Sequence, residues 1–303
     1  MKDYLTEIND LFPIRRREEE KQKFYNYVKT ELGEDRVKRE TLCKKHNNIV
    51  IGDVEEASVV FTAHYDTPMS SLVPNLMFPA DKLKGTLFHF AYPLLLAILS
   101  LLVALSVCSL LGLGENYAIV FYFVLYFGIF YCTTRLVINK HNKNDNTSGI
   151  ATIMSLASEI NNEKVAFILF DNEEKGLLGS KAYAKANNYQ MKNKLVINFD
   201  CVGNGDQIIF IIKEMAEKHE LYELLKAVTI SNEHFDVHHL PFKKCLSNSD
   251  YKNFPCGIGV MASSRARIVK FYTGRIHTSR DTVADSENVY FISGLMKKFI
   301  SEI

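Results

Sequence analysis

The sequence predicts a three-layer α/β domain that is interrupted by a pair of inserted apolar helices. Three observations support this fold class. Short apolar and β-branched runs alternate with segments of helical periodicity, an order typical of a sheet covered by helices on both faces. Two long, nearly charge-free stretches follow each other near the middle of the chain. Acidic residues and histidines stand directly after predicted strands, where α/β proteins gather their ligands.

The first predicted helix covers Arg15–Leu32 and ends at Gly33. Its apolar residues recur at helical spacing and are Phe24, Tyr27, Val28 and Leu32. The charge run Arg15–Lys23 is expected to form the solvated face of this helix.

The other elements alternate along the chain. Strands are expected at Val37–Cys43, Asn48–Ile51, Ser58–Ala63, Val165–Leu169, Leu195–Phe199, Gln207–Ile212, Gly257–Ala262 and Arg267–Phe271. Helices are expected at Gly149–Ile160, Lys181–Asn188, Glu214–Val228 and Ser286–Ile303.

The inserted segment predicts a transmembrane helical hairpin. Phe88–Leu113 contains no Asp, Glu, Lys or Arg, and its length exceeds the roughly 20 residues that span a bilayer. After the polar turn Gly114–Asn116, Tyr117–Ile138 is free of charge until Arg135. We therefore expect a hairpin over residues 85–138 inside one discontinuous domain, residues 1–84 and 139–303. The alternative is a pair of buried or lid-forming helices in a soluble protein.

Flanking charge predicts how the hairpin is oriented. The basic residues on the side of the main domain are Lys82, Lys84, Arg135, Lys140 and Lys143. The turn between the two apolar runs offers only Glu115. The positive-inside rule then places the main domain and both termini in the cytoplasm.

Composition excludes several other classes of protein. A formal net charge of +1 over 303 residues gives no reason to expect a nucleic-acid partner. The six cysteines show no Cys-x-x-Cys spacing, so neither a structural zinc motif nor a disulfide framework is expected. The charged N-terminus lacks the apolar core of a secretory signal.

Two adjacent carboxylates, Glu173 and Glu174, follow the predicted strand Val165–Leu169. Like charges held close together repel each other, and bound cations relieve that repulsion. A dinuclear metal site would use Glu174 as a ligand and Glu173 as the general base. A solvated acidic turn is the alternative for this pair taken alone.

Further candidate ligands stand after strands or before helices. The full set in chain order is His64, Asp145, Glu174, Asp200 and His277. One imidazole and one carboxylate per metal, with a shared carboxylate, would suit two Zn²⁺ ions, although carboxylate-rich sites also accept Co²⁺ or Mn²⁺. Taken singly, His64 with Asp66 also fits ordinary loop polarity, and Asp145 also fits helix capping.

Five motifs together resemble those of the zinc aminopeptidases related to aminopeptidase Y. They are His64-Tyr65-Asp66, Asp145-Asn146-x-Ser148-Gly149, Glu173-Glu174-x-Gly176-Leu177-x-Gly179-Ser180, Asp200-x-x-Gly203 and His277-Thr278-x-x-Asp281-Thr282. The resemblance implies an aminopeptidase-like (phosphorylase/hydrolase-like) fold, in which a mixed central sheet lies between helices, and a site for two zinc ions.

The resemblance also implies a role for each residue. His64 and Asp200 would hold one zinc, Glu174 and His277 the other, and Asp145 would bridge them. Asp66 would orient His64, Glu173 would act as the general base, and Asp281 would steady the loop of His277. Ser249-Asp250 resembles a segment that the family has near its substrate pocket.

Two features depart from the family pattern. Asn142-Lys143-Asn144 precede Asp145 where small residues are usual, and this bulk is expected to narrow the pocket. The hairpin is inserted between the first two ligand motifs, so its ends are expected at the rim of the active site.

The sequence thus predicts a membrane-anchored dizinc aminopeptidase that acts on peptides with a free N-terminus and contacts lipid through its hairpin. The alternatives are glutaminyl-cyclase-like chemistry with one zinc, a non-catalytic membrane scaffold and, least favoured, a transporter subunit. Surface or core packing is expected for the other histidines, which are His46, His89, His141, His219, His234, His238 and His239. The preferred N-terminal residue, the physiological substrate and the oligomeric state do not follow from the sequence.

Overall fold

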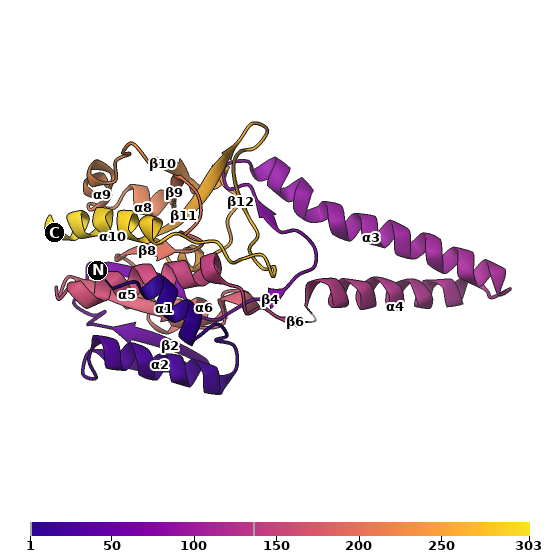
Figure 1. The fold of residues 1–303 in the computed structure, drawn as a ribbon, viewed down its shortest axis with the longest axis horizontal. Helices are drawn as coiled ribbons and strands as arrows, with labels where there is room; N and C mark the ends of the chain where they lie inside the picture. The colour runs from indigo at the N-terminus through magenta and orange to yellow at the C-terminus, as the bar shows by residue number, and fades with distance from the viewer. Residues whose placement is uncertain (1, 136) are drawn as a thin grey trace.

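The computed structural model describes residues 2–135 and 137–303, which form an α/β body and a projecting arm (Figure 1). The strands are β1 (Val37–Leu42), β2 (His46–Ile51), β3 (Val59–His64), β4 (Met69–Ser70), β5 (Leu76–Met77), β6 (Val137–Ile138), β7 (Val165–Phe170), β8 (Leu195–Phe199), β9 (Gln207–Ile212), β10 (Asp236–Pro241), β11 (Gly257–Ala266) and β12 (Lys270–Gly274). The α-helices are α1 (Tyr4–Leu11), α2 (Glu18–Leu32), α3 (Lys82–Leu110), α4 (Glu115–Thr134), α5 (Gly149–Glu159), α6 (Leu178–Ala186), α7 (Asn188–Met191), α8 (Glu214–Glu217), α9 (Tyr222–Val228) and α10 (Ser286–Ser301).

The central sheet is mixed, as expected. Its strands run in the order β1-β2-β7-β3-β8-β11, and β9 and β10 continue it beyond β11. Strands β7, β3, β8 and β11 are parallel to one another, whereas β2 and β9 run antiparallel to their neighbours in this core. The far end of β11 pairs with β12, which pairs in turn with β5.

Helices cover both faces of the sheet because successive strand residues point to opposite sides. On β3, Phe61 packs with α2, α5 and α10 in one core cluster, while its neighbour Val60 packs with Tyr183 of α6 in another. Phe167 and Ile168 of β7 divide between the same two clusters. The three-layer α/β fold class is therefore confirmed.

Several local expectations differ from the structure. Helix α1 and strand β10 were not expected from the sequence, and the helix expected over Glu214–Val228 is divided into α8 and α9. The charge run Arg15–Lys23 is not simply a solvated face, because Arg15 is fully buried and Lys21 is 4% exposed.

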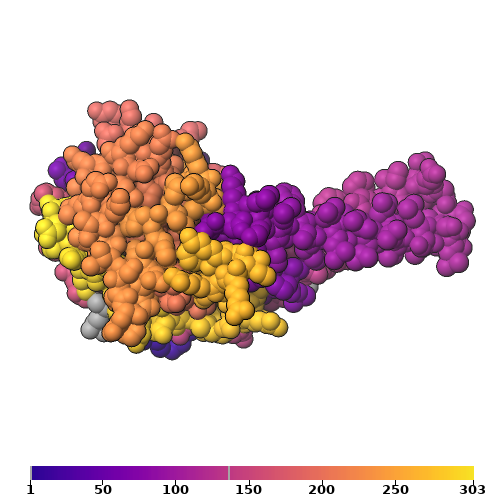
Figure 2. All heavy atoms as spheres, turned by 90° about the horizontal axis from the view of Figure 1, so that it is seen from above, coloured from indigo at the N-terminus to yellow at the C-terminus, as the bar shows by residue number. Residues whose placement is uncertain are grey.

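Helices α3 and α4 form the arm, which projects from the end of the body opposite the two chain termini (Figures 1 and 2). Both are long and apolar enough to cross a membrane. Their large side chains face outward: Leu95 on α3 is 56% exposed and Phe127 on α4 is 60% exposed. The two helices are therefore not buried in the core of the described body, whereas lid-forming helices remain the alternative to a membrane hairpin. Leu136, inside the second expected apolar run, lies outside the described residues.

Candidate metal centre

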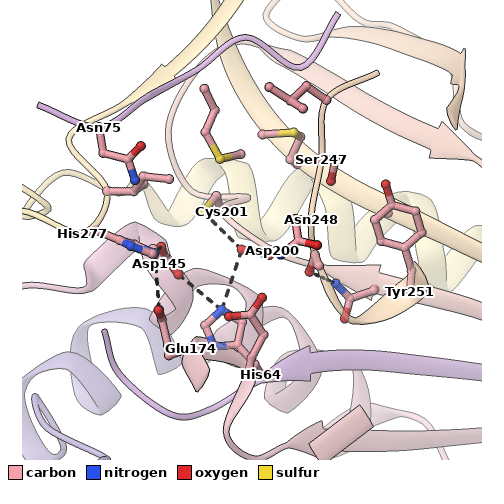
Figure 3. A pocket seen from close by; sticks show the side chains of 18 of the residues that line it. His64, Asn75, Asp145, Glu174, Asp200, Cys201, Ser247, Asn248, Tyr251 and His277 are labelled. Atoms are coloured by element: carbon pink, nitrogen blue, oxygen red, sulfur yellow. Dashed lines mark hydrogen bonds and ion pairs between the residues drawn. The ribbon is translucent and has the colours of Figure 1, made fainter. Parts of the chain in front are cut away.

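The predicted ligands converge at the carboxyl ends of the parallel strands (Figure 3). His64 is the last residue of β3, and Asp200 directly follows β8. Glu174 lies in a one-turn helix, Glu173–Lys175, just after β7. Asp145 lies in the turn before α5, and His277 follows β12. Parallel strands end at one edge of the sheet, which brings these distant residues together.

Asp145 lies at the centre of this cluster, and its two carboxylate oxygens face different partners. Its Oδ1 is 3.2 Å from His64 Nε2, which is 3.8 Å from Asp200 Oδ1. Its Oδ2 is 2.9 Å from His277 Nε2, which is 3.5 Å from Glu174 Oε1. Two three-residue groups, each compact enough to hold one cation, therefore share Asp145.

Electrostatics within the cluster favour an ionised Asp145 but protonated forms of the two glutamates. Although burial opposes ionisation, His277 and His64 hold the pKa of Asp145 well below its usual range. Burial raises the pKa of Glu174 to about 8, even though His277 opposes this shift. Burial also raises the pKa of Glu173 well above its usual range, with His64 opposing. Positive charge placed among these carboxylates would lower their pKa values.

The donor set fits zinc. Two imidazoles and three carboxylates are ligand types that Zn²⁺ takes in proteins. Glu174 Oε1 is buried and accepts no hydrogen bond from any described residue. A buried carboxylate oxygen that accepts no hydrogen bond is costly, and a bound cation would satisfy it.

Asp66 supports the turn that carries the paired glutamates. Its Oδ1 accepts a hydrogen bond from the Glu173 backbone N–H at 2.9 Å, and its Oδ2 accepts one from Glu174 at 3.3 Å. The carbonyl oxygen of Asp66 lies 3.2 Å from His64 Nδ1, nearer than its carboxylate at 3.7 Å. Asp66 therefore contacts His64 mainly through its backbone, and its carboxylate holds the glutamate turn.

The Asp281 side chain supports the turn of Asp145, whereas its backbone N–H donates to the Thr278 carbonyl oxygen in the loop of His277. The backbone N–H groups of Asn144 and Asp145 donate to Asp281 Oδ1 and Oδ2, both at 3.0 Å. Burial and the nearby Asp145 raise the pKa of Asp281 to about 7.

Two buried cations near the cluster were missed by sequence reasoning. Arg15 Nε donates to the Tyr65 carbonyl at 2.6 Å, and its Nη2 donates to Asn142 Oδ1 at 2.9 Å. Lys21 forms a buried ion pair with Asp171, two residues before Glu173. One signal was present in the sequence, because Lys21 shares the helical spacing of the buried α2 face.

A cavity of about 620 Å³ opens beside the cluster. Its apolar lining includes Met77, Ile211, Leu246, Val260 and Met261. His89 and Ser249 also line it, whereas Asp250 is fully buried and accepts a hydrogen bond from Ser180. His89 was expected to serve only in packing. Residues 142–144 are not among the lining residues, so their bulk does not narrow this cavity.

His238 and His239 also lie away from this cavity, on strand β10. His238 Nε2 is 2.9 Å from Gln207 Oε1, and His239 Nε2 is 2.8 Å from Thr229 Oγ1. Both therefore serve local packing and hydrogen bonding in the part of the chain that the structure describes.

Comparisons with known proteins agree with the fold. Residues 140–290 match the model described as peptidase family M28. No curated protein sequence matches the chain. A glutaminyl cyclase from Porphyromonas gingivalis has a TM-score of 0.61 at 13% identity, and the match covers 99% of this chain and 97% of that one.

Two peptidase structures are also similar. A Zn-dependent exopeptidase from Parabacteroides distasonis has a TM-score of 0.58 at 13% identity, covering 98% of this chain and 95% of that one. The LapA aminopeptidase from Legionella pneumophila has a TM-score of 0.55 at 17% identity, covering 98% of this chain and 69% of that one. At these identities the similarity establishes the shared fold.

Proposed function

We propose that the chain, whose residues 140–290 match the model of peptidase family M28, is a membrane-anchored dizinc aminopeptidase of that family. It removes single residues from peptides with a free N-terminus, and its motifs resemble those of the aminopeptidase Y group. One observation carries the proposal: the two oxygens of Asp145 face two separate groups of possible ligands.

Each group would hold one metal ion. His64 and Asp200 are assigned to the first, Glu174 and His277 to the second, and Asp145 to both. Zinc suits this set, and Co²⁺ or Mn²⁺ are compatible with it. Glu174 Oε1 is buried and accepts no hydrogen bond from the described residues, which supports a ligand role for this residue.

Glu173 is the proposed general base. Bound zinc ions would make a water molecule more acidic and polarise the scissile carbonyl. Glu173 lines the cavity beside the ligands, and it accepts the proton of the attacking water and passes it to the leaving amine. Asp66 fixes the backbone of Glu173, so the carboxylate is held in place before the substrate binds.

The arm would anchor the protein by spanning the bilayer twice. Residues 85–138 form this anchor, and residues 1–84 with 139–303 form the catalytic domain. Outward-facing apolar side chains on α3 and α4 support contact with lipid. Basic residues at the base of the arm favour a cytoplasmic catalytic domain and cytoplasmic termini.

Two alternatives differ in measurable ways. Glutaminyl-cyclase-like chemistry would use one metal ion, whereas the assignment above requires two. A non-catalytic scaffold would not need the full ligand set together with the base Glu173. A transporter remains unsupported, because the two apolar runs carry no charge within their cores.

The decisive experiment is cleavage of a mixed peptide library by the detergent-purified protein with zinc, read by mass spectrometry. The parent should release single N-terminal residues. Glu173→Gln should lower the rate about 10²–10⁴-fold while still binding two metals. Glu163→Gln, at an exposed glutamate before β7, is the matched control and should retain the parental rate.

Three outcomes would contradict the proposal. One bound zinc per chain would favour the cyclase. No cleavage with no metal bound would refute the peptidase and favour the non-catalytic scaffold. Equal activity of Glu173→Gln and the parent would remove Glu173 from the mechanism.

A further inference from the structure

A second cavity, of about 770 Å³, lies between the body and the base of the arm. We call it the chamber. The arm contributes Phe88, Ala91, Tyr92, Pro93 and Phe130 to its wall. The segment between β4 and β5 contributes Ser71, Val73, Pro74 and Asn75. The chamber therefore combines an apolar wall from the arm with the rim of the body.

The chamber adjoins the metal centre. Residues that line both cavities are Asn75, His89, Arg135, Glu174 and His277. Glu174 and His277 belong to one of the two candidate metal groups. A peptide of a few residues therefore suffices to reach from the ligands into the chamber.

The position of the chamber along the arm matches the edge of a bilayer. Helix α4 has 20 residues, which span about 30 Å, the thickness of the hydrocarbon layer. The same length counted back along α3 from Leu110 ends at Ala91. The arm residues of the chamber lie around this point, where the helices would leave the hydrocarbon.

The charged residues in the chamber wall agree with a position at the edge of the hydrocarbon layer. Arg16 and Arg135 line the side nearer the body, whereas rings such as Phe88 and Phe130 line the arm side. Basic side chains beside an apolar wall are typical of the membrane interface. A fully water-soluble peptide would gain little from such a wall, because its polar side chains would lose water there.

We propose that the substrate is a membrane-embedded peptide whose free N-terminus reaches the metal centre while its apolar segment lies in the chamber. This inference rests on the aminopeptidase function proposed above and names its substrate class. The apolar segment would begin within a few residues of the N-terminus, because the chamber and the ligand cluster share Glu174 and His277.

The test compares two peptides with the same first four residues in the same detergent micelles. One continues into an apolar Leu/Ala helix of about 20 residues, a length that spans a bilayer, and the other into a Gly/Ser/Glu chain of equal length. For the parent, kcat/KM should be at least about tenfold higher for the apolar peptide, a difference of about 1.4 kcal/mol.

Two tryptophan variants distinguish binding of the apolar peptide in the chamber from its simple uptake into micelles. Ala91→Trp places an indole ring in the wall of the chamber and obstructs it, so the ratio of the two kcat/KM values should fall toward one. Val103→Trp, at an exposed position of α3 about 18 Å farther from the body, should keep the parental ratio. An unchanged ratio in Ala91→Trp, or a parental ratio near one, would overturn the inference.

Photocrosslinking gives an answer that does not depend on a variant. A benzophenone placed at the start of the apolar segment should label residues 88–93 of the parent. Labelling elsewhere, with a phospholipid retained in the chamber, would overturn the inference. Labelling of residues 88–93 without cleavage of either peptide would uphold the chamber as the binding site and refute the peptidase function.

Discussion

Replacing Lys21 with Met should destabilise the protein and disturb the candidate centre together. The Lys21 side chain is 5% exposed and its partner Asp171 is 1% exposed, so the substitution leaves a buried carboxylate without its cation. Loss of one partner of a buried ion pair costs about 3–5 kcal/mol. For a domain of this size, that corresponds to a fall in melting temperature on the order of 10 °C.

The deficit should depend on pH in a defined direction. Burial already raises the pKa of Asp171, and Lys21 opposes that shift. Without Lys21 the folded-state pKa rises further above the unfolded value, so folding takes up a proton. The stability lost by the variant therefore grows as the pH rises through the folded-state pKa and shrinks toward pH 5.

The assay is thermal unfolding of the detergent-solubilised protein at pH 5 and pH 8, with zinc present. Lys23→Met is the matched control, because Lys23 is exposed on the same helix and should change stability by less than about 0.5 kcal/mol. Equal melting temperatures for both variants would refute this account of the buried pair. So would a Lys21→Met deficit that is larger at pH 5 than at pH 8.

Further predictions concern the centre and the arm. Asp281→Asn replaces a carboxylate that accepts hydrogen bonds from two backbone N–H groups with an amide that also donates. Metal affinity, measured by titration calorimetry, should therefore fall about 10–100-fold. The control Asp285→Asn should leave the metal affinity unchanged. Removal of metal with a chelator should lower the melting temperature of the parent, while Asp145→Asn should show little further loss because it already lacks the shared ligand. The orientation can be tested in vesicles whose cytoplasmic face points outward. A membrane-impermeant maleimide should label the exposed Cys43 but should not label a cysteine introduced by Glu115→Cys at the tip of the arm. The reverse labelling pattern would contradict the proposed orientation.

The sequence predicted the centre of the sheet well. Strands β3, β7 and β8 agree with their predicted ranges within one residue at each end, because strands buried on both faces read as continuous apolar runs. Strand β10 was missed because Asp236–Pro241 is a half-exposed edge strand whose six residues include the polar Asp236, His238 and His239. The local pattern there lacks the apolar run that identified the others.

The break between α8 and α9 depends on a tertiary contact. His219 Nε2 lies 2.8 Å from the Asn193 carbonyl oxygen, and its Nδ1 accepts a hydrogen bond from the Leu221 backbone N–H. The ring thereby supports a turn where the sequence continues a helical pattern. No local sequence signal shows that Asn193 lies there.

The candidate ligands were predictable because each carries a local signal, an acidic or histidine residue that stands just after a strand or just before a helix. The buried cations were not, because their partners are distant in sequence. Lys21 lies 150 residues from Asp171, and Arg15 lies 127 residues from Asn142. A run of charged residues in a predicted helix is expected to face solvent unless those partners are known.

The place of the arm in the chain explains why this apolar arm and the candidate metal centre share a wall. His64 ends β3 and Asp145 precedes α5, so any insertion between them begins and ends at the edge of the sheet where the ligands gather. A simple anchor would function equally well at either terminus, and both termini lie at the opposite end of the body (Figure 1). An insertion at the ligand edge instead brings Phe88 and Phe130 to a cavity that also contains Glu174 and His277. This topology therefore favours an arm that delivers the substrate as well as holding the protein at the membrane.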